Sequence, residues 1–236
     1  MKLIDKLLDA LSPPMIKCVI CGREIDTSKH GICDKCMKEM PLNSHVCKKC
    51  GVDIRTMNVY CDTCGKNQLL FNEARSVCRF EGYAKTLVYR LKFGNHRYLA
   101  DVMAHMMKKI FDGQHWLVDE ITFIPISAET KRKRGYNQAK LLADSLGKLT
   151  GLPVVNLANK VRDLGPQEDK TYDERFADMA GIFEIAAKPK PNVLIIDDVK
   201  TTGATLNEMT KVLRKNGCEN VYCLTFASNV RKIPME

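Results

Sequence analysis

The sequence predicts an α/β fold, a parallel sheet covered by helices on both faces, preceded by a small cysteine-rich domain. Three observations lead to this prediction. Apolar runs alternate with helical patterns from about residue 71 to the end of the 236-residue chain, which is typical of parallel sheets. Four CxxC pairs lie within the first 64 residues. The composition, 45% hydrophobic and 28% charged, is that of a folded globular protein. We therefore expect two domains, residues 1–70 and 71–236.

The first residues, MKLIDKLLDAL, place Leu3, Leu7 and Leu11 on one helical face, and Pro13 is expected to end that helix. Charged residues such as Asp5 interrupt the segment, so it lacks the uniform apolar core of a secretion signal. No later apolar run reaches the roughly 18 residues that a membrane-spanning helix needs. We therefore expect a cytoplasmic protein with no stable membrane insertion.

The cysteines predict zinc sites rather than disulfides. The chain has 11 cysteines, most of them in CxxC pairs, and no export signal accompanies them. Each CxxC turn points two thiolates at one metal, and the loops between pairs are long enough to bring a second pair round it. Four cysteines leave no open coordination position, so both sites are expected to hold structural Zn²⁺ and to fold only when loaded. The expected ligands are Cys18, Cys21, Cys33, Cys36, Cys47, Cys50, Cys61 and Cys64.

Two pairings of these motifs satisfy the spacing. In the simplest, the cysteines of residues 18–36 bind one zinc and those of residues 47–64 bind the other, and an interleaved pairing stays open. A redox role needs a CxxC at the end of a strand that opens into a helix, and these motifs lack that context. Gly22, Gly51 and Gly65 each follow a second cysteine, where a knuckle turn favours a residue that takes positive φ.

The formal net charge is +9 at pH 7, with each cysteine counted as neutral. A zinc ion held by four thiolates has a net charge of about −2, so two such sites lower the total to about +5. Most of the basic excess lies after residue 70. It is compatible with polyphosphate substrates, with nucleic acid, or simply with a solvated basic surface.

The first elements of the predicted α/β domain follow from apolar periodicity. ARSVCRF, at residues 74–80, is typical of a short strand. Residues 83–111 are rich in helix formers with apolar residues at near-helical spacing, and Gly94 and Asn95 divide them into two helices. The β-branched run ITFIPIS, at residues 121–127, predicts the next strand.

The later elements continue the same alternation. A helix is expected at residues 137–149, with Gly151 as its stop signal. PNVLIIDD, at residues 191–198, is an apolar strand that ends in two acids, and a helix at 204–216 and a strand at 220–226 follow. Strands that alternate with helices in this way predict a parallel sheet.

The informative chemistry lies in VLIIDDVKTTGAT, at residues 193–205. The strand delivers Asp197 and Asp198 to the carboxyl edge of the sheet, where ligands bind in open α/β folds. The turn at residues 200–205 is built of small hydroxyl residues around Gly203 and leads into a helix N-terminus, an arrangement that holds a phosphate. A GxxxxGKS loop is absent, which disfavours nucleoside triphosphate hydrolysis. Acids directly before a phosphate nest suit a sugar phosphate.

DDVKTTGAT resembles the 5-phosphoribosyl pyrophosphate (PRPP) motif of type I phosphoribosyltransferases, and nearly the whole chain resembles the ComF family of competence proteins. Members of that family carry a double zinc ribbon ahead of a phosphoribosyltransferase domain. The resemblance therefore implies a type I phosphoribosyltransferase fold and a role in DNA uptake. RKRGYNQ, at residues 132–138, is similar to the family's RxRGFNQ. The other matching residues are Pro125, Leu91, Lys92, Phe93, Pro166, Gln167, Arg175, Gly181 and Phe183.

The same resemblance implies roles for the residues of the motif. Asp197 and Asp198 are expected to bind the ribose hydroxyls of PRPP, while Mg²⁺ bridges its ribose and pyrophosphate oxygens. The turn at residues 126–128 is expected to face the pyrophosphate. The residues expected to cradle the 5-phosphate are Thr201, Thr202, Gly203, Ala204 and Thr205.

A basic run at residues 131–134 follows the strand end beside this site. In phosphoribosyl transfer, the bond to C1 breaks through an oxocarbenium-like state while negative charge builds on the departing pyrophosphate, so nearby cations are stabilising. Arg132 and Arg134 are the residues expected to act in this way. The alternative is a solvated basic loop.

The sequence thus predicts a PRPP-binding transferase whose acceptor it does not identify. The alternative is a catalytically silent module of the same fold that binds single-stranded DNA, with other DNA-uptake proteins as partners. Tyr89, Phe93 and Tyr98 lie among basic residues such as Arg90, which suits a base-stacking platform, although aromatic residues on an amphipathic helix usually belong to the core.

Overall fold

The computed structural model describes residues 17–26, 29–54, 58–66, 69–162 and 178–229. The chain divides into two compact units, Met1–Met40 and Pro41–Glu236, and the larger one includes the second group of cysteines. The helix expected at residues 1–11 lies outside the described residues. The domain boundary expected at residue 70 stays a prediction, because compact units reflect packing and not independent folding.

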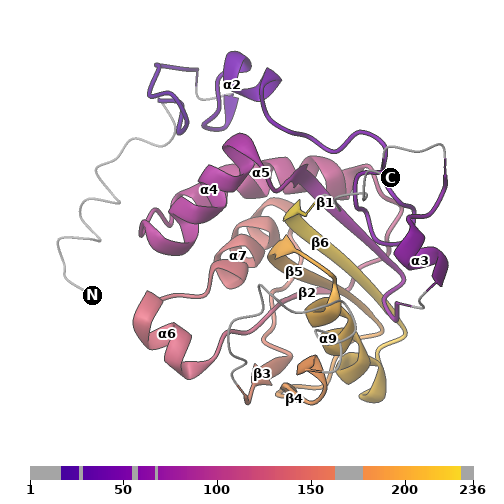
Figure 1. The fold of residues 1–236 in the computed structure, drawn as a ribbon. Coiled ribbons are helices and arrows are strands. Elements are labelled where there is room, and N and C mark those ends of the chain that lie inside the picture. The colour runs from indigo at the N-terminus through magenta and orange to yellow at the C-terminus, as the bar shows by residue number, and fades with distance from the viewer. Residues whose placement is uncertain (1–16, 27–28, 55–57, 67–68, 163–177, 230–236) are drawn as a thin grey trace. The chain divides into compact units, whose positions relative to one another are not determined.

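The centre of the larger unit is a four-stranded, wholly parallel sheet in the order β1-β6-β5-β2 (Figure 1). β5 and β6 are the central strands, and their continuous apolar runs are mostly buried. The predicted α/β class with a parallel sheet is confirmed. The strands are β1 (Glu73–Arg79), β2 (Glu120–Phe123), β5 (Asn192–Lys200) and β6 (Asn220–Ser228).

Helices cover both faces of this sheet, as predicted. α4, α5 and α7 lie together on one face (Figure 1). On the other face, Leu206 and Met209 of α9 join Val193 and Ile195 of β5 in one apolar cluster. Side chains of a strand alternate between faces, so Leu194 faces the opposite layer. The helices are α4 (Gly82–Phe93), α5 (Leu99–Asp112), α7 (Gln138–Thr150) and α9 (Ala204–Lys215).

The strand expected at residues 121–127 is shorter than predicted. The N–H of Ile124 donates the last hydrogen bond to β5, with N and O 3.0 Å apart. Pro125 follows, and the residues of β2 that pair with β5 end at Phe123. Ser127 then caps the first turn of α6 (Ala128–Arg134), so the basic run at residues 131–134 lies on a short helix.

Four further short elements lie where no element was expected. They are α2 (Asp34–Lys38), α3 (Asp62–Lys66) and the antiparallel strands β3 (Ala158–Lys160) and β4 (Phe183–Ile185). Each has five residues or fewer, which is too short for apolar periodicity to reveal. Among the described residues, none of the helices combines the length and the apolar character that crossing a bilayer requires.

The second cysteine segment, residues 41–66, packs directly on β1. The N–H of Ala74 donates to the carbonyl of Lys49, with N and O 2.8 Å apart. Gly51 has φ +67°, and a Cβ at that position would lie 2.4 Å from the carbonyl oxygen of Ala74. Glycine therefore allows the close approach of this segment to the sheet.

Candidate functional site

The four cysteines of the smaller unit form one cluster. Their sulfur atoms all lie within 4.8 Å of one another, and the Sγ atoms of Cys21 and Cys33 are 3.7 Å apart. Burial opposes ionisation of Cys18, but backbone N–H groups, first that of Cys33, lower the pKa of its thiol to about 6. The cluster consists of Cys18, Cys21, Cys33 and Cys36. Four sulfur ligands at this spacing fit tetrahedral Zn²⁺.

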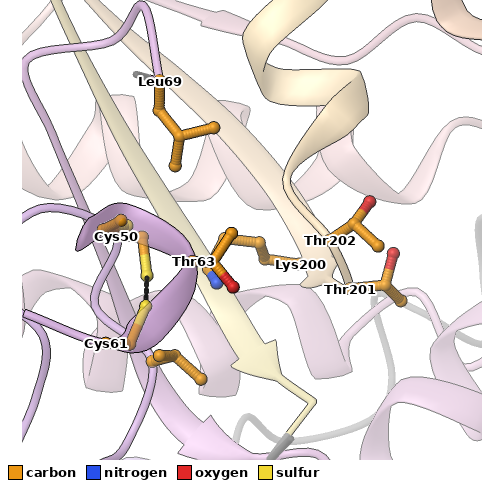
Figure 2. Close-up of a pocket in the computed structure, with 9 residues that line it drawn as sticks. Cys50, Cys61, Thr63, Leu69, Lys200, Thr201 and Thr202 are labelled. Atoms are coloured by element: carbon orange, nitrogen blue, oxygen red, sulfur yellow. Dashed lines mark hydrogen bonds between the residues drawn. The ribbon is translucent and has the colours of Figure 1, made fainter. Parts of the chain in front are cut away.

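The other four cysteines form a second cluster in the larger unit, and all four sulfur atoms again lie within 4.8 Å of one another. The Sγ atoms of Cys50 and Cys61 are 3.7 Å apart (Figure 2). This cluster belongs to the apolar core, because Cys47 and Cys50 pack with Phe71, Ile195 and other buried residues. Its members are Cys47, Cys50, Cys61 and Cys64.

The turns within the clusters differ in one respect from expectation. Gly22 and Gly51 have φ values of +73° and +67°, and the N–H of each donates to the carbonyl of the first cysteine of its motif. Gly65 makes the same type of hydrogen bond, to Cys61, but it lies within α3 and its φ is not positive. The expectation of positive φ at Gly65 was wrong, because a helical turn also brings that N–H back to the first cysteine.

Two four-cysteine clusters are therefore present, grouped sequentially along the chain. Both donor sets fit structural Zn²⁺, and neither leaves an open position for water. Cys78, Cys218 and Cys223 are buried outside the clusters, as expected for free cysteines. Burial raises the pKa of Cys78 to about 12 and that of Cys218 to about 11, so both are neutral thiols at pH 7.

At the carboxyl edge of the sheet, β5 presents Asp197 and Asp198. Asp198 is 3% exposed, and its Oδ2 lies 2.6 Å from the Nζ of Lys92 on α4. The Nε2 of Gln138 on α7 donates to the other oxygen of Asp198, 3.4 Å away. Burial, and then the neighbouring Asp198 carboxylate, raise the pKa of Asp197 well above its usual range. The edge therefore holds a carboxylate pair neutralised in part by a lysine.

The turn after β5 leads into α9 through Gly203, which has φ +87° and occupies the N-cap position. The hydroxyl of Thr202 accepts from the N–H of Ala204, 3.3 Å away, and Thr201 is exposed. Free N–H groups of the first helical turn and these hydroxyls suit an anion. Lys200 was expected in this turn, but it is the last residue of β5 and pairs with Ser228 of β6.

The two arginines expected to be catalytic differ in their surroundings. Arg134 donates to the amide oxygen of Gln138, and its guanidinium lies over the ring of Phe93, 5.4 Å from the centroid. It thus reaches Asp198 through Gln138. Arg132 is exposed on α6. The structure brings Arg134, but not Arg132, into contact with the residues around Asp198.

Other expected site residues are placed as follows. In the turn at residues 126–128, the Oγ of Ser127 accepts from the N–H of Thr130, 3.1 Å away, so the turn begins α6. Tyr136 is buried, donates to the carbonyl of Leu91 and lies under the guanidinium of Arg97, which makes it a packing residue. Residues 163–177, including Pro166, Gln167 and Arg175, lie outside the described residues.

Sequence reasoning gave no role to Lys92 or Gln138. Both residues belong to segments that resemble the ComF family, LKF and RKRGYNQ, so their place in these motifs is the sequence feature that points to a role at the site. In the structure these motifs meet: Lys92 and Gln138, from two separate segments, both contact the carboxylate of Asp198.

Comparisons with known proteins agree with the cysteine clusters. The family described as "Double zinc ribbon domain" matches residues 7–65. A crystal structure of the protein TT1426 from Thermus thermophilus is 12% identical, covers 58% of this chain and 84% of its own, and has a TM-score of 0.34, a likeness too slight to indicate the fold.

Curated relatives match most of the chain. "Competence protein F" of Haemophilus influenzae is 26% identical over 215 residues, covering 87% of this chain and 93% of the relative. "Competence protein ComFC" of Bacillus subtilis is 25% identical and covers 79% of each chain. "DNA utilization protein YhgH" of Salmonella typhimurium is 24% identical and covers 88% of this chain and 95% of the relative. The resemblance to the ComF family is thereby confirmed: this chain is a homologue of the proteins named Competence protein F, ComFC and YhgH, with a double zinc ribbon in its N-terminal part.

Proposed function

We propose that the protein binds PRPP with Mg²⁺ at the carboxyl edge of β5 and transfers its phosphoribosyl group to an acceptor that is still to be identified. One observation supports this most strongly. The side chains of Lys92 and Gln138, from two motif segments, both contact the buried carboxylate of Asp198, which belongs to the third. Asp198 lies on the strand that leads into the N-terminus of α9. A sugar polyphosphate needs both features, acceptors for its hydroxyls and donors for its phosphate.

In this proposal the carboxylates of Asp197 and Asp198 accept hydrogen bonds from the ribose hydroxyls. Burial, and then the Asp198 carboxylate, raise the pKa of Asp197, so a cation bound beside the pair would favour its ionised form. Carboxylate oxygens also suit Mg²⁺, which PRPP brings with it. The N–H groups at the start of α9 and the hydroxyls of Thr201, Thr202 and Thr205 hold the 5-phosphate, with Gly203 and Ala204 supplying backbone N–H groups.

Transfer breaks the bond between C1 and the pyrophosphate oxygen, whose electron pair leaves with the pyrophosphate, and forms a bond between C1 and a nucleophilic atom of the acceptor, which supplies its own electron pair. Cations beside the leaving group stabilise its growing negative charge. Arg134 and Lys92 border the site from two sides. Arg132, exposed on α6, is the second arginine proposed to stabilise this charge.

The test is a calorimetric titration of zinc-loaded protein with PRPP and Mg²⁺, beside the variant Asp197→Asn/Asp198→Asn. The expected result is saturable binding that the double variant loses. Lys188→Met, an exposed change in the same unit, is the matched control and is expected to bind normally. Folded, zinc-loaded protein that does not bind PRPP would contradict the proposal.

A second candidate function is binding of single-stranded DNA without catalysis. Tyr89, Phe93 and Tyr98 were expected to be core residues, but they are 48%, 69% and 51% exposed. The rings of Tyr89 and Phe93 lie 5.8 Å apart, and the ammonium of Lys85 lies 5.7 Å from the Tyr89 centroid. Exposed rings with adjacent cations suit stacked bases.

Fluorescence anisotropy with a labelled oligothymidylate tests this second candidate. Phe93→Ala is expected to weaken binding, whose affinity also falls steeply with salt. Leu117→Ala removes an equally exposed apolar side chain elsewhere, 76% exposed, and is the control. DNA binding without PRPP binding would favour the second candidate over the first.

The setting of either activity is proposed from the relatives. Proteins named for competence and for DNA utilization support a role in the uptake or use of DNA, with other proteins of that process as partners. A cytoplasmic location is part of the same proposal.

A further inference from the structure

Lys200 is a buried lysine at the end of β5, directly before the candidate phosphate turn. It is 5% exposed and lines a small cavity with Cys50, Cys61 and Cys64 of the second cysteine cluster. Figure 2 shows the Lys200 side chain extending toward the cysteines and Thr63, whereas the side chains of Thr201 and Thr202 extend to the other side. Thr201 and Thr202 line the same cavity, and the Cδ of Lys200 lies 4.0 Å from where a Cβ on Gly203 would stand. The end of the Lys200 side chain thus points across the cavity to the zinc ribbon, while its base lies beside the phosphate turn.

The ammonium group of Lys200 makes no hydrogen bond and no ion pair with a carboxylate in the described part of the chain. Burying a lysine without an opposite charge is costly, so a buried ammonium usually has an anionic partner. Burial raises the pKa of Cys223, so it is a neutral thiol, and hydrogen bonding with Cys47 raises the pKa of Cys50. The positive charge of Lys200 opposes both shifts.

The second cysteine cluster supplies the missing negative charge once it holds metal. Four thiolates with one Zn²⁺ have a net charge of about −2. Outer groups that donate to thiolates or balance their charge tune metal affinity, often by about 10- to 100-fold, as is common for the residues around a metal's direct ligands. Thr63 is 6% exposed, and its hydroxyl also has no hydrogen-bond partner in the described residues. The cavity between the cluster and Lys200 therefore has a polar group on the Thr63 side as well as on the Lys200 side.

We propose that the positive charge of Lys200 balances the negative charge of the second zinc centre, and that this attraction holds the end of β5 against the zinc ribbon. Lys200 is a positioning residue: it does not bind the metal but balances the charge of the thiolates that do. The proposal explains why a lysine is tolerated in the core and why the residues that follow it, Thr201 to Gly203, leave the sheet at a fixed place. It does not depend on PRPP binding.

The test compares zinc release from the full-length, zinc-loaded protein with that from Lys200→Met and Lys200→Arg. Release is followed with a chelating dye, and each centre is identified by its resonance in cadmium-113-substituted protein. We expect Lys200→Met to release zinc from the second centre about tenfold faster or more, by loss of the outer charge. Lys200→Arg, which keeps the charge, is expected to stay within a few-fold of the unmodified protein.

The chain contains its own control, because the first cluster lies in the other compact unit. Its zinc release and its cadmium resonance are expected to be the same in all variants, and Lys188→Met is expected to change neither centre. If Lys200→Met does not fold by circular dichroism, Lys200→Gln, which keeps a polar terminus in the cavity, is measured in its place.

Three outcomes would overturn the proposal. Zinc release and the cadmium resonance of the second centre unchanged in Lys200→Met would show that the charge is not needed. Equal acceleration at both centres would indicate a general loss of stability. Weaker PRPP binding with normal zinc release would assign Lys200 to the ligand instead.

Discussion

The Nζ of Lys92 and the Oδ2 of Asp198 lie 2.6 Å apart, and this ion pair joins the end of α4 to the carboxyl end of β5. The Asp198 side chain is 4% exposed and that of Lys92 is 24% exposed. With Gln138 on its other oxygen, the carboxylate is held in one position before any ligand arrives. A preset carboxylate loses less freedom when it binds a sugar hydroxyl, which favours affinity.

Lys92→Met is expected to lower the free energy of unfolding by about 1–3 kcal/mol, because it leaves a buried carboxylate with one neutral donor. Urea unfolding measures this loss. Asp198→Asn in the same chain is expected to recover part of it, since the uncompensated charge is gone, and a double-mutant cycle gives the coupling. Strictly additive losses would contradict the importance of the ion pair.

The raised pKa of Asp197 predicts a pH dependence of stability. Burial and the Asp198 carboxylate raise that pKa in the native protein, so the native state holds the proton more tightly than the unfolded chain. The stability from this group is therefore fully present below the unfolded pKa and is lost as pH rises through the native pKa. Asp197→Asn is expected to be more stable than the unmodified protein at about pH 8, with a smaller gain at about pH 5, closer to the unfolded pKa. Urea unfolding of zinc-loaded protein at both values checks this, and a gain independent of pH would exclude ionisation of Asp197 as its cause.

The two zinc centres are expected to differ in their importance for the larger unit. Cys61→Ser removes a ligand that packs in the core of that unit, whereas Cys33→Ser removes one from the smaller unit. Each variant is expected to retain about one zinc per chain. Cys61→Ser is expected to lower the melting temperature of the larger unit and to abolish PRPP binding, because an unloaded thiolate site does not fold. Calorimetry and zinc analysis test this pair, and equal melting of the larger unit in both variants would disprove it.

Gly51→Ala is expected to be strongly destabilising, by about 3 kcal/mol or more, since left-handed strain adds to overpacking. A Cβ there would lie 2.4 Å from the carbonyl oxygen of Ala74. Gly181→Ala is the matched control in the same unit: its φ is +71°, but nothing lies within 4 Å of its Cβ. It is expected to cost only the strain, about 1–2 kcal/mol. Chemical denaturation compares the two, and similar losses would mean that the contact with Ala74 relaxes easily.

Local features of the fold were well predicted because local residues determine them. Asn137 accepts from the N–H of Ala139, 2.9 Å away, and so begins α7, and Gly151 ends it with φ +74°. Gly94 separates α4 from α5 as expected. One local prediction was wrong. Ile124 to Ser127 carry a strand-like sequence, but β2 ends at Phe123 and Ser127 caps the first turn of α6, a capping signal that the strand prediction overlooked.

The candidate site depends on both local and distant residues. The spacing of the CxxC pairs by itself determined two four-cysteine zinc sites, and an apolar strand followed by DDVKTTGAT by itself determined a carboxylate pair before a helix N-terminus. Only the tertiary structure decided that Lys92 and Gln138 meet Asp198, that Tyr89 and Phe93 face solvent, and that the second cysteine cluster lies against Lys200. These contacts join segments far apart in the sequence. They depend on the order of the strands and on which face each helix covers, and neither is encoded in the spacing of neighbouring residues.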